Sequence, residues 1–342
     1  MNHLKRLIAL LLLTMLTVTA ASADTLLTSW PREHTARRII LAGDCWYAMM
    51  GAYGQPDAEL AVGDDLDALT TVYEDDASVW SFTATQNHAA WVQCGTDNVL
   101  RWMLYDRLSG KVEEIWQEAM TDTRPCFSVG LDENALYYVR VDSEQGTAEL
   151  ISRSLTDGTE TVLYQPECPI SAMTLRGEFM HLAVNKPDGW RLVSANVVTR
   201  DAYYEHTLPD TVKLIYDVDY DASTGFYALY YLDTDGRKHA AVLSMMRLKN
   251  LYTFASSSYA VADTLEIADG HLYWGVQMNW SGNVTDHYVV VDYDLASNRP
   301  VEYARGYWFS LAEDALLVLT FGSDGNYETC ALNAYAYPAP LE

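Results

Sequence analysis

The sequence predicts an all-β protein built as a single β-propeller of about seven four-stranded blades. The first observation is a pair of back-to-back copies of one pattern between Val79 and Gln165, where each copy reads as four short strands joined by turns. The second is composition: the strand segments alternate apolar and polar residues and are rich in Val, Tyr, Trp, Phe and Ile, whereas the breaks carry Gly, Asn and Asp. A four-stranded antiparallel unit that recurs at a spacing of about 40 residues is typical of a propeller blade.

The same pattern continues on both sides of these two copies. It predicts blades at residues 37–75, twice within 79–165, at 168–208, 212–254 and 259–305, and from 307 onward. Lys186–Gly189 and Asp233–Gly236 each predict a tight turn between the second and third strands of a blade. Capped segments with helical periodicity do not follow the N-terminal stretch, so the sequence does not predict a separate α/β catalytic domain.

The third observation is a lone strand near the N-terminus. Thr25–Trp30 has no local partner, while the last blade, which begins at Tyr307, shows three strands where the others show four. Pairing these segments would close the ring and leave no open sheet edge, which is a template for aggregation. We therefore expect the N-terminal strand to complete the last blade. Six or eight blades would follow from one misread repeat.

The first residues have the layout of a secretory signal peptide. Lys5 and Arg6 precede an apolar run from Leu7 to Leu16, and a small-residue A-S-A tripeptide ends at Ala23. We expect residues 1–23 to be removed and residues 24–342 to form one secreted propeller domain, with a cell-envelope location as the alternative. An uncleaved anchor is less favoured because the apolar run is shorter than the ~20 residues of a membrane span.

The charge balance limits the partners that the sequence predicts. The chain carries 47 acidic and 22 basic side chains, a formal net charge of −25. Such a surface repels phosphate backbones and anionic lipid, so we expect no nucleic-acid partner and no membrane insertion after signal cleavage. We expect a monomer that binds a protein or a carbohydrate ligand.

The cysteines do not define a metal or redox motif. None of the five has the close spacing of a zinc knuckle or a redox pair. Buried free thiols are the favoured interpretation, and an oxidising location would also allow up to two bridges with one thiol left over. The five are Cys45, Cys94, Cys126, Cys168 and Cys330.

Three phrases of the third blade resemble known bacterial secreted propellers. They are Glu133–Val139 (ENALYYV), Ile151–Gly158 (ISRSLTDG) and Thr161–Leu163 (TVL). A strand reading xLYYV, a strand ending in DG and a closing xxL resemble the repeats of the TolB-like and low-density-lipoprotein-receptor YWTD-like families. The resemblance implies a propeller used mainly for binding. It transfers no catalytic motif, and the strict YWTD tetrapeptide is absent from the sequence.

Aromatic residues mark the predicted ligand site. Most of the 24 Tyr and 10 Trp alternate along strands and are expected to pack between blades. A few fall at the start of a first strand or in a turn between second and third strands, on the upper face of the ring. Rings exposed there can stack on sugars or anchor a protein. The predicted ligand-binding residues are Tyr53, Trp80, Tyr216, Trp280 and Tyr307.

Local signatures of catalysis are missing from the sequence. It contains no nucleophile elbow, zinc-peptidase motif or phosphate loop, so no catalytic residue, cofactor or metal is predicted. Asp217–Gly225 starts like a calcium loop but has Ala222 at the turn position that requires Gly, and an acidic strand end is the simpler interpretation. The alternative functions are a carbohydrate-active hydrolase or lyase with acids gathered in the central funnel, and a purely structural surface protein.

Overall fold

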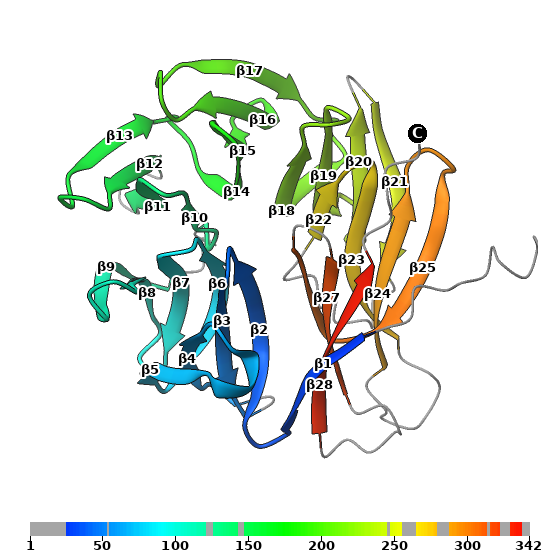
Figure 1. Ribbon diagram of the computed structural model, residues 1–342. Coiled ribbons are helices and arrows are strands. Elements are labelled where there is room, and N and C mark those ends of the chain that lie inside the picture. The colour runs from blue at the N-terminus through cyan, green and yellow to red at the C-terminus, as the bar shows by residue number, and fades with distance from the viewer. Residues whose placement is uncertain are drawn as a thin grey trace, which may run out of the picture.

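The computed structural model describes residues 25–52, 55–120, 126–142, 147–244, 247–254, 265–278, 287–312, 315–321 and 329–336. Within these ranges every regular element is a β-strand except one 3₁₀ turn, η1 (Leu66–Ala68). The strands form seven four-stranded antiparallel sheets arranged as blades around a ring (Figure 1). The all-β, seven-bladed propeller predicted from the repeat pattern is therefore confirmed.

The first three blades each run outward from the ring axis through four consecutive strands (Figure 1). Blade 1 contains β2 (Thr35–Ala42), β3 (Cys45–Gly51), β4 (Ala58–Gly63) and β5 (Thr70–Asp75). Blade 2 contains β6 (Ala77–Ala84), β7 (His88–Gly95), β8 (Val99–Asp106) and β9 (Lys111–Ala119). Blade 3 contains β10 (Gly130–Leu131), β11 (Ala135–Asp142), β12 (Thr147–Ser154) and β13 (Glu160–Tyr164).

The next three blades repeat this order. Blade 4 contains β14 (Ile170–Arg176), β15 (Phe179–Lys186), β16 (Gly189–Asn196) and β17 (Ala202–Thr207). Blade 5 contains β18 (Val212–Asp221), β19 (Phe226–Asp233), β20 (Lys238–Ser244) and β21 (Arg247–Phe254). Blade 6 contains β22 (Leu265–Ala268), β23 (His271–Met278), β24 (His287–Asp294) and β25 (Arg299–Arg305).

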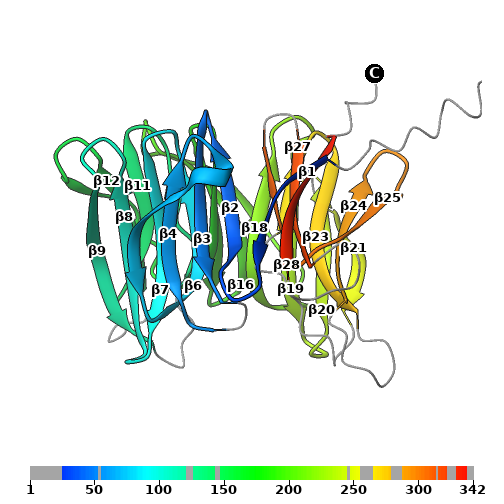
Figure 2. The ribbon, with the colours of Figure 1, turned by 60° about the horizontal axis from the view of Figure 1, so that its bottom comes forward.

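Blade 7 joins the two ends of the described chain. Its inner strands are β26 (Trp308–Leu311), β27 (Ala315–Phe321) and β28 (Thr329–Ala336), and its outermost strand is β1 (Thr25–Pro31). β1 runs antiparallel to β28, with Thr25 opposite Ala334 and Pro31 opposite Thr329. Both views of the ribbon show these strands side by side (Figures 1 and 2). The predicted closure by the N-terminal strand is confirmed.

The hydrophobic core is divided among the blade interfaces. The described residues contain seven buried apolar clusters, and each joins two neighbouring blades around the ring. The cluster between blades 1 and 2, for example, packs Tyr47 against Trp91, whereas Ile39 and Leu319 meet between blades 1 and 7. The alternating apolar residues of each strand thus face adjacent sheets, and large flat side chains fill the space between them.

One turn type recurs between strands. In this five-residue turn, the backbone carbonyl of the first residue accepts a hydrogen bond from the N–H of the fifth residue. The side chain of the first residue accepts a hydrogen bond from the N–H of the third, and the fifth residue has a positive φ. A residue that tolerates positive φ is needed at the fifth position, and Gly158 (φ 72°) supplies it in blade 3. The turns are Asp106–Gly110, Ser154–Gly158, Asn196–Arg200, Asp221–Gly225 and Asp294–Asn298.

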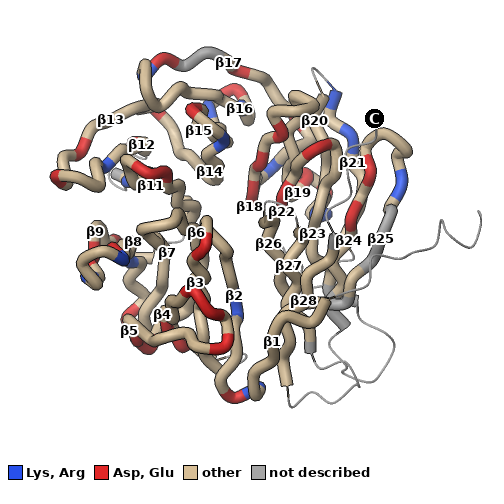
Figure 3. Tube along the Cα trace, in the orientation of Figure 1, with Lys and Arg blue, Asp and Glu red and all other residues tan. Residues whose placement is uncertain are grey.

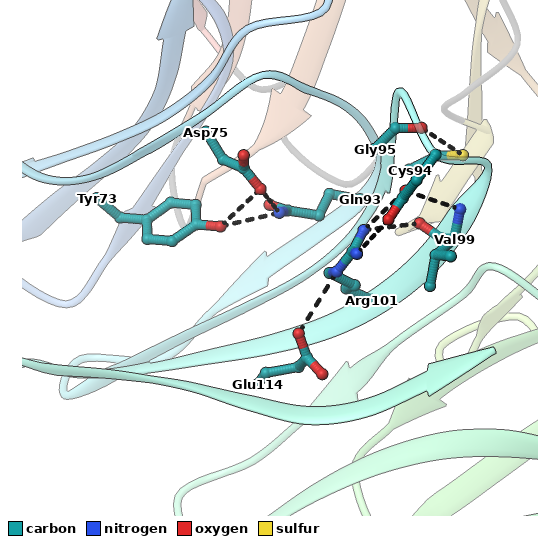
Figure 4. A network of polar contacts seen from close by, with 9 residues as sticks. Tyr73, Asp75, Gln93, Cys94, Gly95, Val99, Arg101 and Glu114 are labelled. Atoms are coloured by element: carbon teal, nitrogen blue, oxygen red, sulfur yellow. Dashed lines mark hydrogen bonds and ion pairs between the residues drawn. The ribbon is translucent and has the colours of Figure 1, made fainter. Parts of the chain in front are cut away.

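A buried polar network fastens blade 1 to blade 2 (Figure 4). The Gln93 side chain is fully buried, and its Nε2 donates to Tyr73 Oη at 2.8 Å and to Asp75 Oδ2 at 2.6 Å. Its Oε1 accepts from Trp91 Nε1 at 2.6 Å. Both Nε2 bonds join the second strand of blade 2 to the outer strand of blade 1, while the bond to Trp91 within β7 holds the Gln93 side chain in place.

The predicted signal peptide, residues 1–23, lies outside the residues that the structure describes. Along the described ranges, no helix has the length and apolar character needed to cross a membrane. All five cysteines are free thiols, four of them buried and Cys94 partly buried.

Candidate functional site

A cavity of about 570 Å³ occupies the ring axis, where the first strands of the blades converge. Its wall takes residues from β2, β6, β14, β18, β22 and β26 and from residues 127–129 just before β10, so all seven blades contribute. This volume falls within the range of small-molecule sites, roughly 300–1,000 Å³. The axial cavity is the candidate functional site.

A repeated β-bulge shapes the wall of this cavity. In the first strands of four blades, one extra residue lies opposite the step between the fifth and sixth residues of the second strand, and β18 has a further extra residue at Lys213. A bulge re-aims the side chain of the extra residue away from the regular alternation. Three of the four bulge residues line the cavity, and Arg37 instead donates to the carbonyl oxygens of Gln55 and Asp57, both at 2.8 Å. The bulge residues are Arg37, Trp80, Ser171 and Tyr216.

Two of the five predicted ligand residues are brought together here. Trp80 and Tyr216 both line the cavity, and each is a bulge residue. Trp80 packs on Phe127 of the next blade with ring centroids 4.5 Å apart. Tyr216 packs on Tyr230 at 5.1 Å, so each predicted ring forms part of a two-ring wall.

The other three predicted residues are placed differently. Tyr53 and Trp280 lie outside the described residues. Tyr307 is only 8% exposed and packs in the cluster between blades 7 and 1, where its hydroxyl donates to Ala36 O at 2.6 Å. In this position Tyr307 holds two blades together, and we do not include it in the candidate site.

The acidic end of β18 ties blade 5 to blade 6. β22 is the inner edge strand of blade 6, so its inward backbone N–H groups have no partner strand. Alternate aspartates of β18 accept hydrogen bonds from these N–H groups and from the turn that follows β22. Asp217 Oδ2 accepts from Leu265 N at 3.2 Å, and Asp221 Oδ2 accepts from Gly270 N at 2.9 Å. Between them, Asp219 Oδ2 accepts from Ile267 N at 2.9 Å. The period of two places all three carboxylates on one face of β18.

Asp219 also bridges to blade 4. Its carboxylate is 2% exposed and receives Arg176 Nε at 2.8 Å and Arg176 Nη2 at 2.5 Å, in a two-bond fork. Thr174 Oγ1 donates to the same carboxylate at 3.2 Å. Three successive blades thus meet at one ion pair, in which the carboxylate is buried and the guanidinium partly exposed, and the pKa of Arg176 is raised chiefly by the charge of Asp219.

Two other carboxyl groups of the wall hold protons more tightly than usual. Burial, with the nearby charge of Asp219, raises the pKa of Asp217 well above its ordinary value. Burial likewise raises the pKa of Glu266 to about 7, although the Arg176 charge opposes this shift. Near neutral pH these groups therefore carry much less negative charge than two free carboxylates would.

Basic side chains also line the cavity, and β2 carries a basic segment where β18 carries acidic ones (Figure 3). Arg38 donates to Val79 O of the next blade at 3.2 Å. Lys238 Nζ lies 5.5 Å above the Tyr216 ring, a cation–π contact. The wall therefore combines aromatic faces with charges of both signs.

Sequence reasoning missed Arg176, Glu266 and Trp308 as wall residues. Arg176 and Asp219 are 43 residues apart and Asp219 and Ile267 are 48 apart, which is close to one blade repeat. Charged residues that recur one blade repeat apart in the first strands could have predicted these contacts between blades. The bulges that aim Trp80 and Tyr216 inward leave no such signal, because they appear only once the strands are paired.

The arrangement does not favour the hydrolase or lyase alternative. Such chemistry needs a carboxylate that is free to act on a substrate, whereas Asp219 already accepts hydrogen bonds from Arg176, Thr174 and two backbone N–H groups. Among the described residues, no group of three or more His, Cys, Asp or Glu side chains could hold a metal ion.

Comparison with known proteins supports the fold. No protein-family model and no curated protein matches the sequence. The β-propeller domain of the Trilobed protease from Pyrococcus furiosus is similar over 91% of this chain and 98% of that chain, with 10% identity and a TM-score of 0.55. That domain is described as having an open velcro topology, whereas β1 pairs with β28 here.

Two further structures are similar at the same level of identity. The CNH domain of AfRom2 matches over 92% of this chain and all of that chain, with 10% identity and a TM-score of 0.52. A prolyl endopeptidase matches over 90% of this chain with 10% identity and a TM-score of 0.54, and this chain spans about half (51%) of its length. Identities this low show a shared β-propeller fold and nothing about activity.

Proposed function

We propose that the protein is a secreted β-propeller that binds a ligand or partner at the upper mouth of its axial cavity. The observation that carries this proposal is the repeated bulge, because three blades use the same backbone irregularity to aim a side chain at one cavity. Register shifts also recur between the third and fourth strands of six blades, so a repeated bulge alone does not mark a binding site. What supports a binding role is that the first-strand bulges direct side chains from three blades to one cavity, and bulges are over-represented next to active sites.

Two further features support a binding role. The cavity has the size of a ligand site and mixes aromatic faces with a small number of polar groups, which is the usual composition of such sites. The resemblance of the ENALYYV and ISRSLTDG phrases to TolB-like and YWTD-like propellers points to the same class of function. Secretion rests on the N-terminal pattern that ends at Ala23.

The test is a binding screen with matched variants. The purified protein is screened against arrays of peptides and glycans, and each hit is titrated with the double variant Trp80→Ala/Tyr216→Ala. We expect the double variant to lose binding by at least tenfold, about 1.4 kcal/mol. The control is Trp116→Ala/Tyr204→Ala, which removes the same residue types from outer strands β9 and β17. Equal affinity of both double variants would place the site elsewhere and overturn the proposal.

The predicted secretion has its own test. The full chain is expressed with and without residues 1–23, and the N-terminus of the exported product is sequenced. We expect export of the full chain only, and a mature N-terminus at Asp24. An exported product that retains residues 1–23 would contradict cleavage after Ala23.

A further inference from the structure

Three side chains of the axial cavity wall hold shielded polar groups that no described residue pairs. They are the indole N–H groups of Trp80 and Trp308 and the hydroxyl of Ser171. Trp308 is 8% exposed, so its indole is almost entirely removed from water. Buried donors are normally paired, because a donor that loses water and gains no acceptor is costly. These three belong to blades 7, 2 and 4, yet all line one cavity.

The same wall offers groups that both donate and accept. Asp217 and Glu266 are partly buried wall residues whose pKa values are raised by burial, Glu266 to about 7. A protonated carboxyl has an O–H donor beside a carbonyl acceptor. A hydroxyl group on a ligand complements both halves of such a carboxyl, and it also complements an unpaired indole N–H.

The fixed charges of the wall disfavour charged ligands. Arg38, Arg176 and Lys238 line the cavity, and among the acidic residues of the wall Asp219 forms an ion pair, with Arg176. A cationic ligand would meet three like charges and would have to displace protons from Asp217 and Glu266. An anionic ligand would find Arg176 already paired with Asp219 and Arg38 bonded to Val79 O, and its approach is opposed by a formal net charge of −25.

The aromatic walls complete the pattern. Trp80 with Phe127, and Tyr216 with Tyr230, form two ring pairs beside the polar groups. The face of an aromatic ring is electron-rich and attracts the weakly positive C–H groups of a saturated ring. Flat rings beside unpaired donors and neutral carboxyls are the combination that a sugar uses.

We infer that the axial cavity takes a neutral, hydroxyl-rich ligand, a sugar, which stacks on the aromatic wall at Tyr216 and supplies acceptors to the indole N–H groups of Trp80 and Trp308. This inference rests on the proposed function and narrows it. The ligand class follows from the hydrogen-bonding groups of the wall, and the stereochemistry of the sugar would be set by their relative positions.

The experiment removes donors without removing rings. Neutral, uronic-acid and amino-sugar oligosaccharides are arrayed beside a peptide library, and hits are titrated with Trp80→Phe, Trp308→Phe and the control Trp116→Phe on outer strand β9. We expect neutral sugars to bind, each cavity variant to weaken them by about tenfold, and the control to leave affinity unchanged. Trp308 also packs in the apolar cluster between blades 1 and 7, so Trp308→Phe should lower thermal stability, and affinities are therefore compared well below the melting temperature of each variant.

Glu266→Gln separates the neutral ligand from a cationic one. Glutamine is a neutral isostere of the protonated acid, so a bound neutral sugar should keep its affinity within about threefold. A loss above tenfold, with preference for amino sugars, would show that negative charge matters and would overturn the inference. Peptide hits that Trp80→Ala/Tyr216→Ala abolishes, without sugar hits, would overturn the sugar and leave the proposed binding site standing. Hits unaffected by every cavity variant would overturn both.

Discussion

Replacing Asp219 with asparagine should destabilise the ring far more than the same replacement at Asp217, two residues earlier on β18. The two aspartates share a strand, a face and an acceptor role toward β22. They differ in their partners, since Asp219 accepts from the Arg176 guanidinium in a two-bond fork while, among the described residues, Asp217 accepts only from backbone N–H groups. The two residues therefore form a matched comparison of a carboxyl with an ion-pair partner and a carboxyl without one.

The magnitude follows from what each substitution leaves behind. Asp219→Asn removes the negative charge opposite Arg176 and turns an amide N–H toward donors, and breaking a buried pair in this way costs about 3–5 kcal/mol. The Arg176 side chain is 40% exposed and can recover water, so we expect the low end, about 3 kcal/mol. The pKa of the Asp217 carboxyl is strongly raised, and asparagine is an uncharged isostere of this group. The free energy of unfolding of Asp217→Asn should therefore change by less than about 1 kcal/mol.

Urea unfolding of both variants at pH 7 measures the difference. The raised pKa of Asp217 also fixes a sign, because the folded protein keeps a proton that the unfolded chain releases as the pH rises above the ordinary value of 3.8. Asp217→Asn removes this group, so its stability relative to the parent protein should increase as the pH rises from 3.8. Equal losses for the two variants, or a larger loss for Asp217→Asn, would refute this account of the cavity wall.

Two further predictions concern acid stability and ring closure. Burial, aided by the Arg176 charge, lowers the pKa of His181 from 6.5 to about 4. The stability contributed by neutral His181 should be complete above pH 6.5. It should fall by about 3 kcal/mol as the pH drops through 4, because the unfolded chain takes up the proton at a higher pH than the folded protein does. Thermal unfolding of His181→Gln across this range should show a flatter profile, and an unchanged slope would contradict the assignment. Deleting residues 25–31 should expose the β28 edge, lower the melting temperature and promote self-association in sedimentation experiments, and an added peptide of this sequence should reverse both effects. A stable monomer without β1 would show that the ring does not need this strand.

The fold was predictable because its signals are local. Period-two alternation and turn residues such as those of Asp233–Gly236 act within a few positions of each other, so the strands could be located without knowing their neighbours. The closure of blade 7 could also be predicted, since a count of strands left Thr25–Trp30 without a partner and the last blade one strand short. The short β10, confined to Gly130–Leu131, shows how strand length escapes this kind of reasoning.

The site was predictable only in part because its contacts cross blades. Trp80 and Tyr216 were found from their position near the start of a first strand, but the bulges that turn them inward depend on the register with the second strand. The acidic run at Asp217 and Asp219 was identified from sequence, yet its partners Arg176 and Leu265 lie one blade away on either side. Tyr307 has the expected position in its blade and is nevertheless covered by blade 1.

The way β1 meets β28 sets how the molecule should respond to mechanical load. Thr25 lies opposite Ala334 and Pro31 lies opposite Thr329. The N-terminal end of β1 and the C-terminal end of β28 are therefore neighbours at one end of the sheet. A force that pulls the two termini apart would separate the strands one residue pair at a time, like a zipper, and would not have to shear all the pairs at once. Blade 7 is therefore expected to yield first under tension, at low force, while the six blades with contiguous strands stay folded.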